Sequence, residues 1–297
     1  MKLIYLIVFV FFSVVGKAAI PEVSSGTIER FFLASEHVNG RNIDVWLPDG
    51  YTPSKKYATL YMHDGQSLFD KAGMWNGKEW RVDETVDSLL ATSSIQDIII
   101  IGIANDGNNR FAEYFPEKVI SGISLDFRDK LLAFMPDGPK ADSYLSFITE
   151  ELKPFIDQHF STLPDREHTY ICGSSMGGLI SLYALCEYPD VFAGAACIST
   201  HWIGILEPNS QIPEAIGRYL AVQLPPAKDH KLYFDCGTEG LDTSYPVHQS
   251  AIDALLKDKG YGEALLKSLV FRGAGHSEEF WAARFYIPVE FLLDKTL

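Results

Sequence analysis

The hydrophobic and polar positions of the chain fall into short β-type runs that alternate with longer helical patterns. Runs rich in β-branched and aromatic residues predict strands at 27–35, 41–47, 57–62, 97–104, 168–173, 194–199, 231–236 and 264–271. Helical spacing of apolar residues predicts helices at 81–91, 142–160, 177–187, 247–259 and 278–294. From the fourth strand onward the strands are apolar on both faces, as strands covered by helices on two sides must be. This order predicts an α/β fold with a mostly parallel central sheet and helices on both faces.

The first 18 residues, MKLIYLIVFVFFSVVGKA, differ from the rest of the chain. Lys2 precedes an apolar run that reaches Val15, and a short small-residue segment follows, which is typical of a secretory signal peptide. A membrane anchor is the weaker alternative, because a spanning helix needs about 20 apolar residues. We therefore expect an exported protein, periplasmic or secreted and without a stable membrane anchor. Residues 19–297 are long enough for one large core and predict a single globular domain.

Charge and cysteine content exclude several classes of partner. The formal net charge is −14 and no run of Lys or Arg occurs, whereas a nucleic-acid partner would require a basic surface. The cysteines never form a C-x-x-C pair, which argues against zinc and against a redox dithiol, and we expect no metal and no cofactor. Disulfides are an alternative in an exported protein, but the apolar surroundings of all four favour buried free thiols. They are Cys172, Cys186, Cys197 and Cys236.

A candidate nucleophile lies where a predicted strand meets a predicted helix. The segment GSSMG at 173–177 fits the G-x-S-x-G pattern, in which a tight turn lifts the central serine to the edge of a sheet. Ser175 is then the nucleophile, and Ser174 supports the turn. The alternative is an ordinary tight turn with two solvated hydroxyl groups.

A serine nucleophile needs a base and an acid on later loops. Among eight histidines, His276 lies in the glycine-rich loop RGAGHSEEF after the last predicted strand, where the hydrolase chain order places the base. The loop FDCGTEGLD supplies the acid, which would hold the histidine tautomer and stabilise the imidazolium. We favour Asp242 over Glu239, although one of them could instead cap the helix that follows.

Two backbone N–H groups are needed for an oxyanion hole. One is that of Met176, directly after the nucleophile at the start of a helix. The other is that of Gln66 in YMHDGQSLF, where Gly65 allows a close approach. Several aromatic and charged residues fall on the loops expected to rim the site and suit a sugar-linked or aromatic acyl ester, although each taken alone is more typical of packing. These candidates are Trp75, Arg110, Tyr114, His201 and Trp202.

The chain resembles the putative-esterase family, which is similar to enterochelin, feruloyl and acetylxylan esterases, S-formylglutathione hydrolase and the mycolyltransferases. The segments that carry the resemblance are LYMHDGQSLF, IIIGIANDGNNRFAEYFP, DSYLSFITEELKPFID, GSSMGGLISLYALCEYPDVF, FDCGTEGLD and GAGHSEEFW. The resemblance implies an α/β-hydrolase fold without a large lid domain, a metal-free serine mechanism and carboxylic ester substrates. It also assigns Ser175 and His276 as nucleophile and base, and Gln66 and Met176 to the oxyanion hole. Gly240 stands where relatives often carry an acid, which leaves the choice between the two candidate acids open.

Together these features predict an exported serine carboxylic-ester hydrolase that acts on carbohydrate-linked acetyl or feruloyl esters, either small molecules or polysaccharide-linked. A siderophore esterase of the enterochelin type is one alternative. Acyl transfer to a sugar hydroxyl is another, and a catalytically inactive binding module on the same fold is the least favoured.

Overall fold

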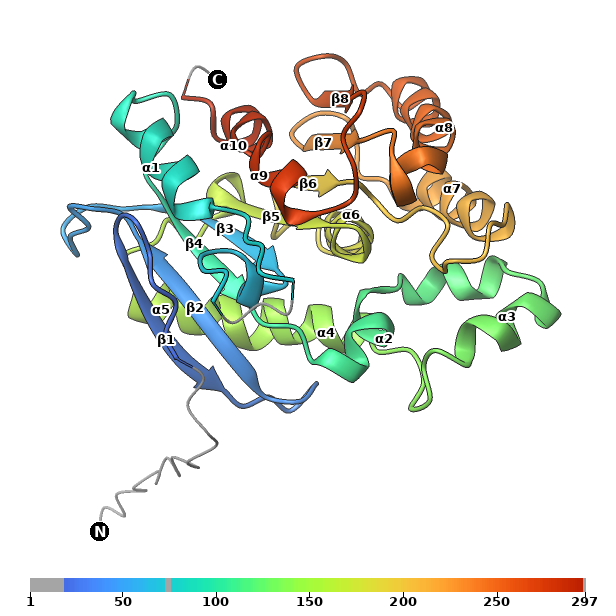
Figure 1. Ribbon diagram of the computed structural model, residues 1–297, viewed down its shortest axis with the longest axis horizontal. Coiled ribbons are helices and arrows are strands. Elements are labelled where there is room, and N and C mark those ends of the chain that lie inside the picture. Colours follow the sequence, from blue (N-terminus) through green and yellow to red (C-terminus); the bar gives the residue numbers. More distant parts are fainter. Residues whose placement is uncertain (1–18, 73–75, 296–297) are drawn as a thin grey trace, which may run out of the picture.

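The computed structural model describes residues 19–72 and 76–295, which form one eight-stranded sheet with helices on both faces (Figure 1). The predicted signal peptide and Trp75 lie outside the described residues. The strands are β1 (Thr27–Leu33), β2 (Arg41–Leu47), β3 (Ala58–His63), β4 (Ile98–Ile103), β5 (Thr169–Ser174), β6 (Gly194–Ile198), β7 (Lys231–Cys236) and β8 (Leu266–Val270). The α-helices are α1 (Val82–Ala91), α2 (Arg110–Tyr114), α3 (Leu125–Leu132), α4 (Ala141–Ser146), α5 (Lys153–His159), α6 (Met176–Glu187), α7 (Gln211–Gln223), α8 (Tyr245–Asp258), α9 (Glu278–Ala282) and α10 (Tyr286–Leu293).

The sheet order is β1-β2-β4-β3-β5-β6-β7-β8. β1 and β2 are antiparallel to each other, β2 is antiparallel to β4, and every later pairing is parallel. The predicted α/β fold with a mostly parallel sheet is therefore confirmed. Because parallel strands end at the same edge, the loops after β3, β5, β6, β7 and β8 meet there.

Two layers of helices bury the two faces of the sheet. α1, α9 and α10 pack on one face, whereas α2 and α4 to α8 pack on the other. Within β4 the side chains of Ile98 and Ile100 enter the first layer, and those of Ile99 and Ile101 enter the second, as strand geometry requires. The central strands are therefore apolar on both faces because helices cover each face.

The helices differ from the predicted pattern in three respects, one of which is that the predicted helix at 278–294 is divided into α9 and α10. α2, α3 and α7 were not predicted, and α7 contains Gly217, which is unfavourable inside a helix, as well as Pro213 in its first turn, where proline is tolerated. The predicted helix at 142–160 is divided into α4 and α5 by a π-helical turn at Phe147–Leu152. Pro154 lacks an N–H donor, which favours such a break in the hydrogen-bond ladder.

The core also holds the cysteines. All four are buried and free, and burial raises the pKa of the Cys236 thiol to about 12.

Of the helices formed by the described residues, none combines the length and the apolar character needed to cross a membrane.

Candidate active site

The turn at Ser175 joins β5 to α6 in a strained conformation. Its φ of 57° and ψ of −121° lie in a region that side-chain-bearing residues rarely adopt. Four hydrogen bonds hold the turn: the N–H of Ser175 donates to Ile198 O, and its carbonyl accepts from the N–H groups of Gly178, Leu179 and His201. The conformation is therefore fixed by β6 on one side and by α6 on the other.

Glycine is required on both sides of this turn. A Cβ on Gly173 would lie 2.8 Å from the backbone of Gly177, and one on Gly178 would lie 2.8 Å from Oγ1 of Thr200. The strand and the helix can approach this closely only without side chains. Ser175 is partly exposed, whereas the neighbouring Ser174 is buried at the end of β5.

Asp242 and His276 form a hydrogen-bonded pair at the same edge. Oδ1 of Asp242 lies 2.5 Å from Nδ1 of His276, and Oδ2 accepts from the Gly237 N–H at 2.6 Å and from the Ser199 hydroxyl at 2.7 Å. Burial raises the pKa of Asp242, but the bond and charge of His276 outweigh it with help from the other two donors, and the net pKa is lowered. The other candidate acid, Glu239, has an exposed side chain.

Aromatic rings fix the orientation of the His276 imidazole. Tyr245 and Trp281 meet it edge to face, with ring centroids 5.8 Å and 5.0 Å away. The side chain of His276 keeps 15% of its surface exposed, so the imidazole is not closed off from solvent.

The loop after β3 lies against the first turn of α6. A Cβ on Gly177 would be 3.6 Å from Oδ2 of Asp64, and one on Gly65 would be 2.6 Å from the backbone of Gly102 in β4. Within the described part of the chain, the N–H groups of Gln66 and Met176 donate to no backbone carbonyl. Two free backbone donors therefore lie on adjacent segments, as an oxyanion hole requires.

Asp64 anchors this loop. It has a φ of 57°, and its carboxylate accepts two bonds from Arg110, at 2.6 and 2.7 Å, and one from Asn105 at 2.6 Å. The Asp64 N–H donates to the hydroxyl of Tyr114 at 3.2 Å. Burial raises the pKa of Asp64, but Arg110 and Asn105 outweigh it and lower the pKa below its ordinary value.

A family profile described as "Putative esterase" matches residues 35–287. The chain belongs to the putative esterase family. It is accordingly a carboxylic ester hydrolase, and its sheet and helices have the α/β-hydrolase arrangement of the solved esterases.

The esterase is similar to one curated protein and to two solved structures along most of its length. YbbA of Bacillus subtilis (strain 168) is 27% identical over 274 residues, which are 88% of this chain and 96% of YbbA. A solved ferulic acid esterase matches with a TM-score of 0.65 at 20% identity, covering 90% of this chain and 98% of its own. The enterobactin esterase FES from Shigella flexneri matches with a TM-score of 0.67 at 15% identity, covering 92% and 61%. At these identities the two structures demonstrate a shared fold.

The predicted substrate contacts of the esterase separate into two groups. Arg110 keeps 30% of its side chain exposed beside the loop that it anchors. Tyr114 and Trp202 are buried, and Nε1 of Trp202 donates to Gln249 inside the protein. These two rings therefore do not rim the site as predicted, because their polar atoms are satisfied within the core. His201 is also buried, with Nδ1 2.5 Å from the Tyr245 hydroxyl, and burial lowers its pKa to about 4.

Sequence reasoning missed the residues that support these groups. Asp64, Ser199, Tyr245 and Trp281 make their contacts across large sequence separations. Only Asp64 carried a local signal, since it adjoins Gly65 in the loop already singled out.

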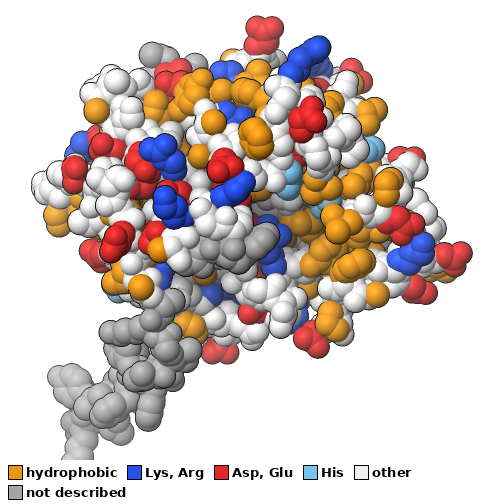
Figure 2. Space-filling view, in the orientation of Figure 1, with side chains coloured by type: hydrophobic (Ala, Val, Ile, Leu, Met, Phe, Trp, Pro, Cys, Tyr) orange, Lys and Arg blue, Asp and Glu red, His pale blue; other side chains and the backbone are white. Residues whose placement is uncertain are grey.

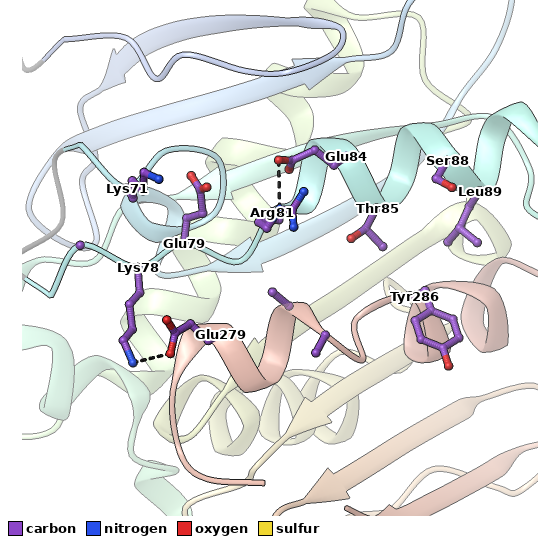
Figure 3. A pocket seen from close by; sticks show the side chains of 13 residues that line it. Lys71, Lys78, Glu79, Arg81, Glu84, Thr85, Ser88, Leu89, Glu279 and Tyr286 are labelled. Carbon is purple, nitrogen blue, oxygen red and sulfur yellow. Dashed lines mark hydrogen bonds and ion pairs between the residues drawn. The ribbon is translucent and has the colours of Figure 1, made fainter.

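A cavity of about 730 Å³ in the esterase lies between α1 and the segment of α9 and α10 (Figure 3). It is lined by charged pairs, among them Lys78 with Glu279 and Arg81 with Glu84. None of the predicted site residues that the structure describes lines it. Across residues 19–72 and 76–295, no group of three His, Cys, Asp or Glu side chains is arranged to hold a metal ion.

His63 makes the stability of the esterase depend on pH. It is buried at the end of β3, where Nδ1 lies 2.8 Å from the Tyr144 hydroxyl, and burial lowers its pKa to about 3. The unfolded chain, with an ordinary histidine pKa of about 6.5, therefore binds a proton below that pH that the folded chain does not bind. Stability contributed by neutral His63 is present above pH 6.5 and is lost as pH falls.

We predict that this histidine alone lowers the free energy of unfolding by about 2 kcal/mol between about pH 7 and pH 5. Urea titrations at both pH values should show a smaller drop in His63→Gln than in the wild type. His159→Gln, which replaces an exposed histidine, is the matched control. An equal pH dependence in His63→Gln and the wild type would contradict the prediction.

Proposed function

We propose that the protein is an exported serine esterase that cleaves carbohydrate-linked acetyl or feruloyl esters through an acyl-enzyme. The observation that carries the proposal is the 2.5 Å contact between Asp242 and His276 at the edge where the strained turn presents Ser175. Contacts through His201 and Tyr245 connect Ser175 to His276. The N–H of His201 donates to Ser175 O, its ring contacts the Tyr245 hydroxyl, and the Tyr245 ring contacts His276. Residues 19–297 would form the single catalytic domain.

The mechanism has two halves. Oγ of Ser175 attacks the ester carbonyl carbon while Nε2 of His276 takes its proton, and Asp242 stabilises the imidazolium. The N–H groups of Gln66 and Met176 bind the oxyanion. The C–O bond then breaks, and the leaving alcohol takes the proton from His276. Water attacks the acyl-enzyme in the same way, which releases the acid and restores Ser175.

Three observations support the substrate class. The first 18 residues have the pattern of a signal peptide, which directs an enzyme toward extracytoplasmic esters. The fold is shared with a ferulic acid esterase. Apolar side chains also gather beside the loop that leads from β6 to α7, over the region between α2, α3 and α7 (Figure 2). Leu125 and Leu206, on α3 and on the loop from β6 to α7, and Phe134, just after α3, are exposed apolar side chains that suit an aromatic acyl group.

A siderophore ester is the second candidate. The fold is equally shared with the enterobactin esterase FES. The exposed part of Arg110 could donate a hydrogen bond to a phenolic oxygen of either acyl group.

Replacing Ser175 tests the nucleophile. We expect Ser175→Ala to lower kcat on p-nitrophenyl acetate by about 10,000-fold or more, because the acyl-enzyme cannot form. Labelling by a fluorophosphonate, read by mass spectrometry, should disappear as well. Ser174→Ala removes the adjacent hydroxyl and should keep the label. Labelled and active Ser175→Ala would overturn the serine mechanism.

Two matched variants test the acid. Asp242→Asn should lower kcat by about 100-fold or more, because the amide favours the wrong histidine tautomer. Glu239→Gln changes an exposed carboxylate on the same loop and should leave kcat within about twofold of the wild type. A large loss in Glu239→Gln together with normal turnover in Asp242→Asn would reverse the assignment.

A panel of esters tests the substrate class. We expect kcat/KM to be about 10-fold higher or more on acetylated or feruloylated xylo-oligosaccharides than on a catecholate trilactone, a difference of about 1.4 kcal/mol in transition-state binding. The opposite order would favour the siderophore ester.

A further inference from the structure

Ser199 occupies a buried position directly after β6. Its side chain has no exposed surface, and its φ of 42° is unusual for a residue other than glycine. The N–H of Ser199 donates to Asp235 O at 2.9 Å, which fixes the backbone to β7. Position 199 carries a serine although its backbone conformation would suit glycine, so a role for the serine hydroxyl group would explain the residue.

The partners of the Ser199 hydroxyl determine where its proton points. Oγ lies 3.0 Å from Nε1 of Trp281, 2.9 Å from Nη2 of Arg284 and 2.7 Å from Oδ2 of Asp242. Indole and guanidinium N–H groups only donate, so Ser199 accepts from both of them. Its own proton then has one remaining partner, the Asp242 carboxylate. The hydroxyl is a donor aimed at that carboxylate.

Arg284 is held so that it can orient the hydroxyl. It is 3% exposed, and Nε and Nη2 donate to the two carboxylate oxygens of Asp235 at 3.1 and 2.9 Å. The hydroxyl of Tyr233 donates to the same carboxylate at 2.9 Å. The buried charge of Arg284 is thus balanced by Asp235, which leaves its contact with Ser199 as a fixed hydrogen bond.

We propose that Ser199 is a positioning residue for the catalytic acid, with its hydroxyl oriented by Trp281 and Arg284. The inference rests on the proposed triad. Together with the Gly237 N–H, Ser199 saturates Oδ2 of Asp242, so that Oδ1 is the oxygen left for His276. The two orienting residues follow His276 in the chain, so the segment that carries the base also holds the acid in place.

Removal of the hydroxyl tests the inference. Ser199→Ala and Ser199→Gly should each lower kcat on p-nitrophenyl acetate by about 10-fold or more and leave KM within about twofold, since a hydrogen bond to a charged group is lost. A carboxylate with one donor fewer is more basic and raises the pKa of the histidine. The acid limb of the kcat/KM profile should therefore move to higher pH, which a purely structural role would not cause.

Further variants separate the possible outcomes. Ser199→Gly suits the local backbone and remains informative if Ser199→Ala unfolds. Trp281→Phe keeps the ring beside His276 but removes the N–H donor, and should give a smaller loss of kcat with a shift in the same direction. Ser250→Ala, exposed on α8, is the control. If Ser199→Gly keeps the wild-type kcat and the acid limb of its profile does not move, the inference is overturned. If Ser175→Ala is inactive in the same experiment, the proposed function still holds.

Discussion

The arrangement at the sheet edge depends on how closely the loops after β7 and β8 can approach. A Cβ on Gly237 would lie 2.1 Å from the carbonyl oxygen of Ala274, so a side chain is excluded at this point. That carbonyl accepts from the N–H groups of Thr238 and Glu239, which joins the two loops. The same approach aims the Gly237 N–H at Asp242 and brings Asp242 within hydrogen-bonding distance of His276. The contact between Asp242 and His276 is therefore a consequence of backbone packing.

Two buried arginine–carboxylate pairs and one partly buried pair extend this rigidity across the sheet. Arg284 is bound by Asp235 close to Asp242, and Arg110 is bound by Asp64 in the loop after β3. The third pair, Arg41 with Glu113, joins β2 to α2. Arg110 begins α2 and Glu113 lies within it. The five-residue helix α2 therefore connects β2, through Glu113 and Arg41, to the loop after β3, through Arg110 and Asp64. Removing one partner of either buried pair, Arg284–Asp235 or Arg41–Glu113, would leave a buried charge unbalanced, which typically costs about 3–5 kcal/mol.

Local patterns in the sequence were sufficient to predict the strands, and they singled out Ser175 and His276 as the candidate nucleophile and base. Strands and the turn at Ser175 are encoded by neighbouring residues, and His276 followed from its place after the last strand. The choice between Asp242 and Glu239 could not be settled locally, because they lie three positions apart on one loop and only tertiary packing buries Asp242. Likewise, the burial of Tyr114 depends on elements remote in sequence. Ser199 meets Trp281 and Arg284 across 82 and 85 residues, a separation over which no sequence pattern is informative.

The four buried thiols can report how often the central part of the fold opens to solvent. They lie on β5, α6, β6 and β7, the central elements against which the serine turn and the acid loop are built. A thiol must reach solvent and ionise before an alkylating reagent can modify it. The rate of modification in the native protein therefore reports how often the middle of the sheet separates, whereas exposed loops do not contribute to it. The four cysteines, which have no role in the proposed mechanism, thus report the stability of the central sheet on which that mechanism depends.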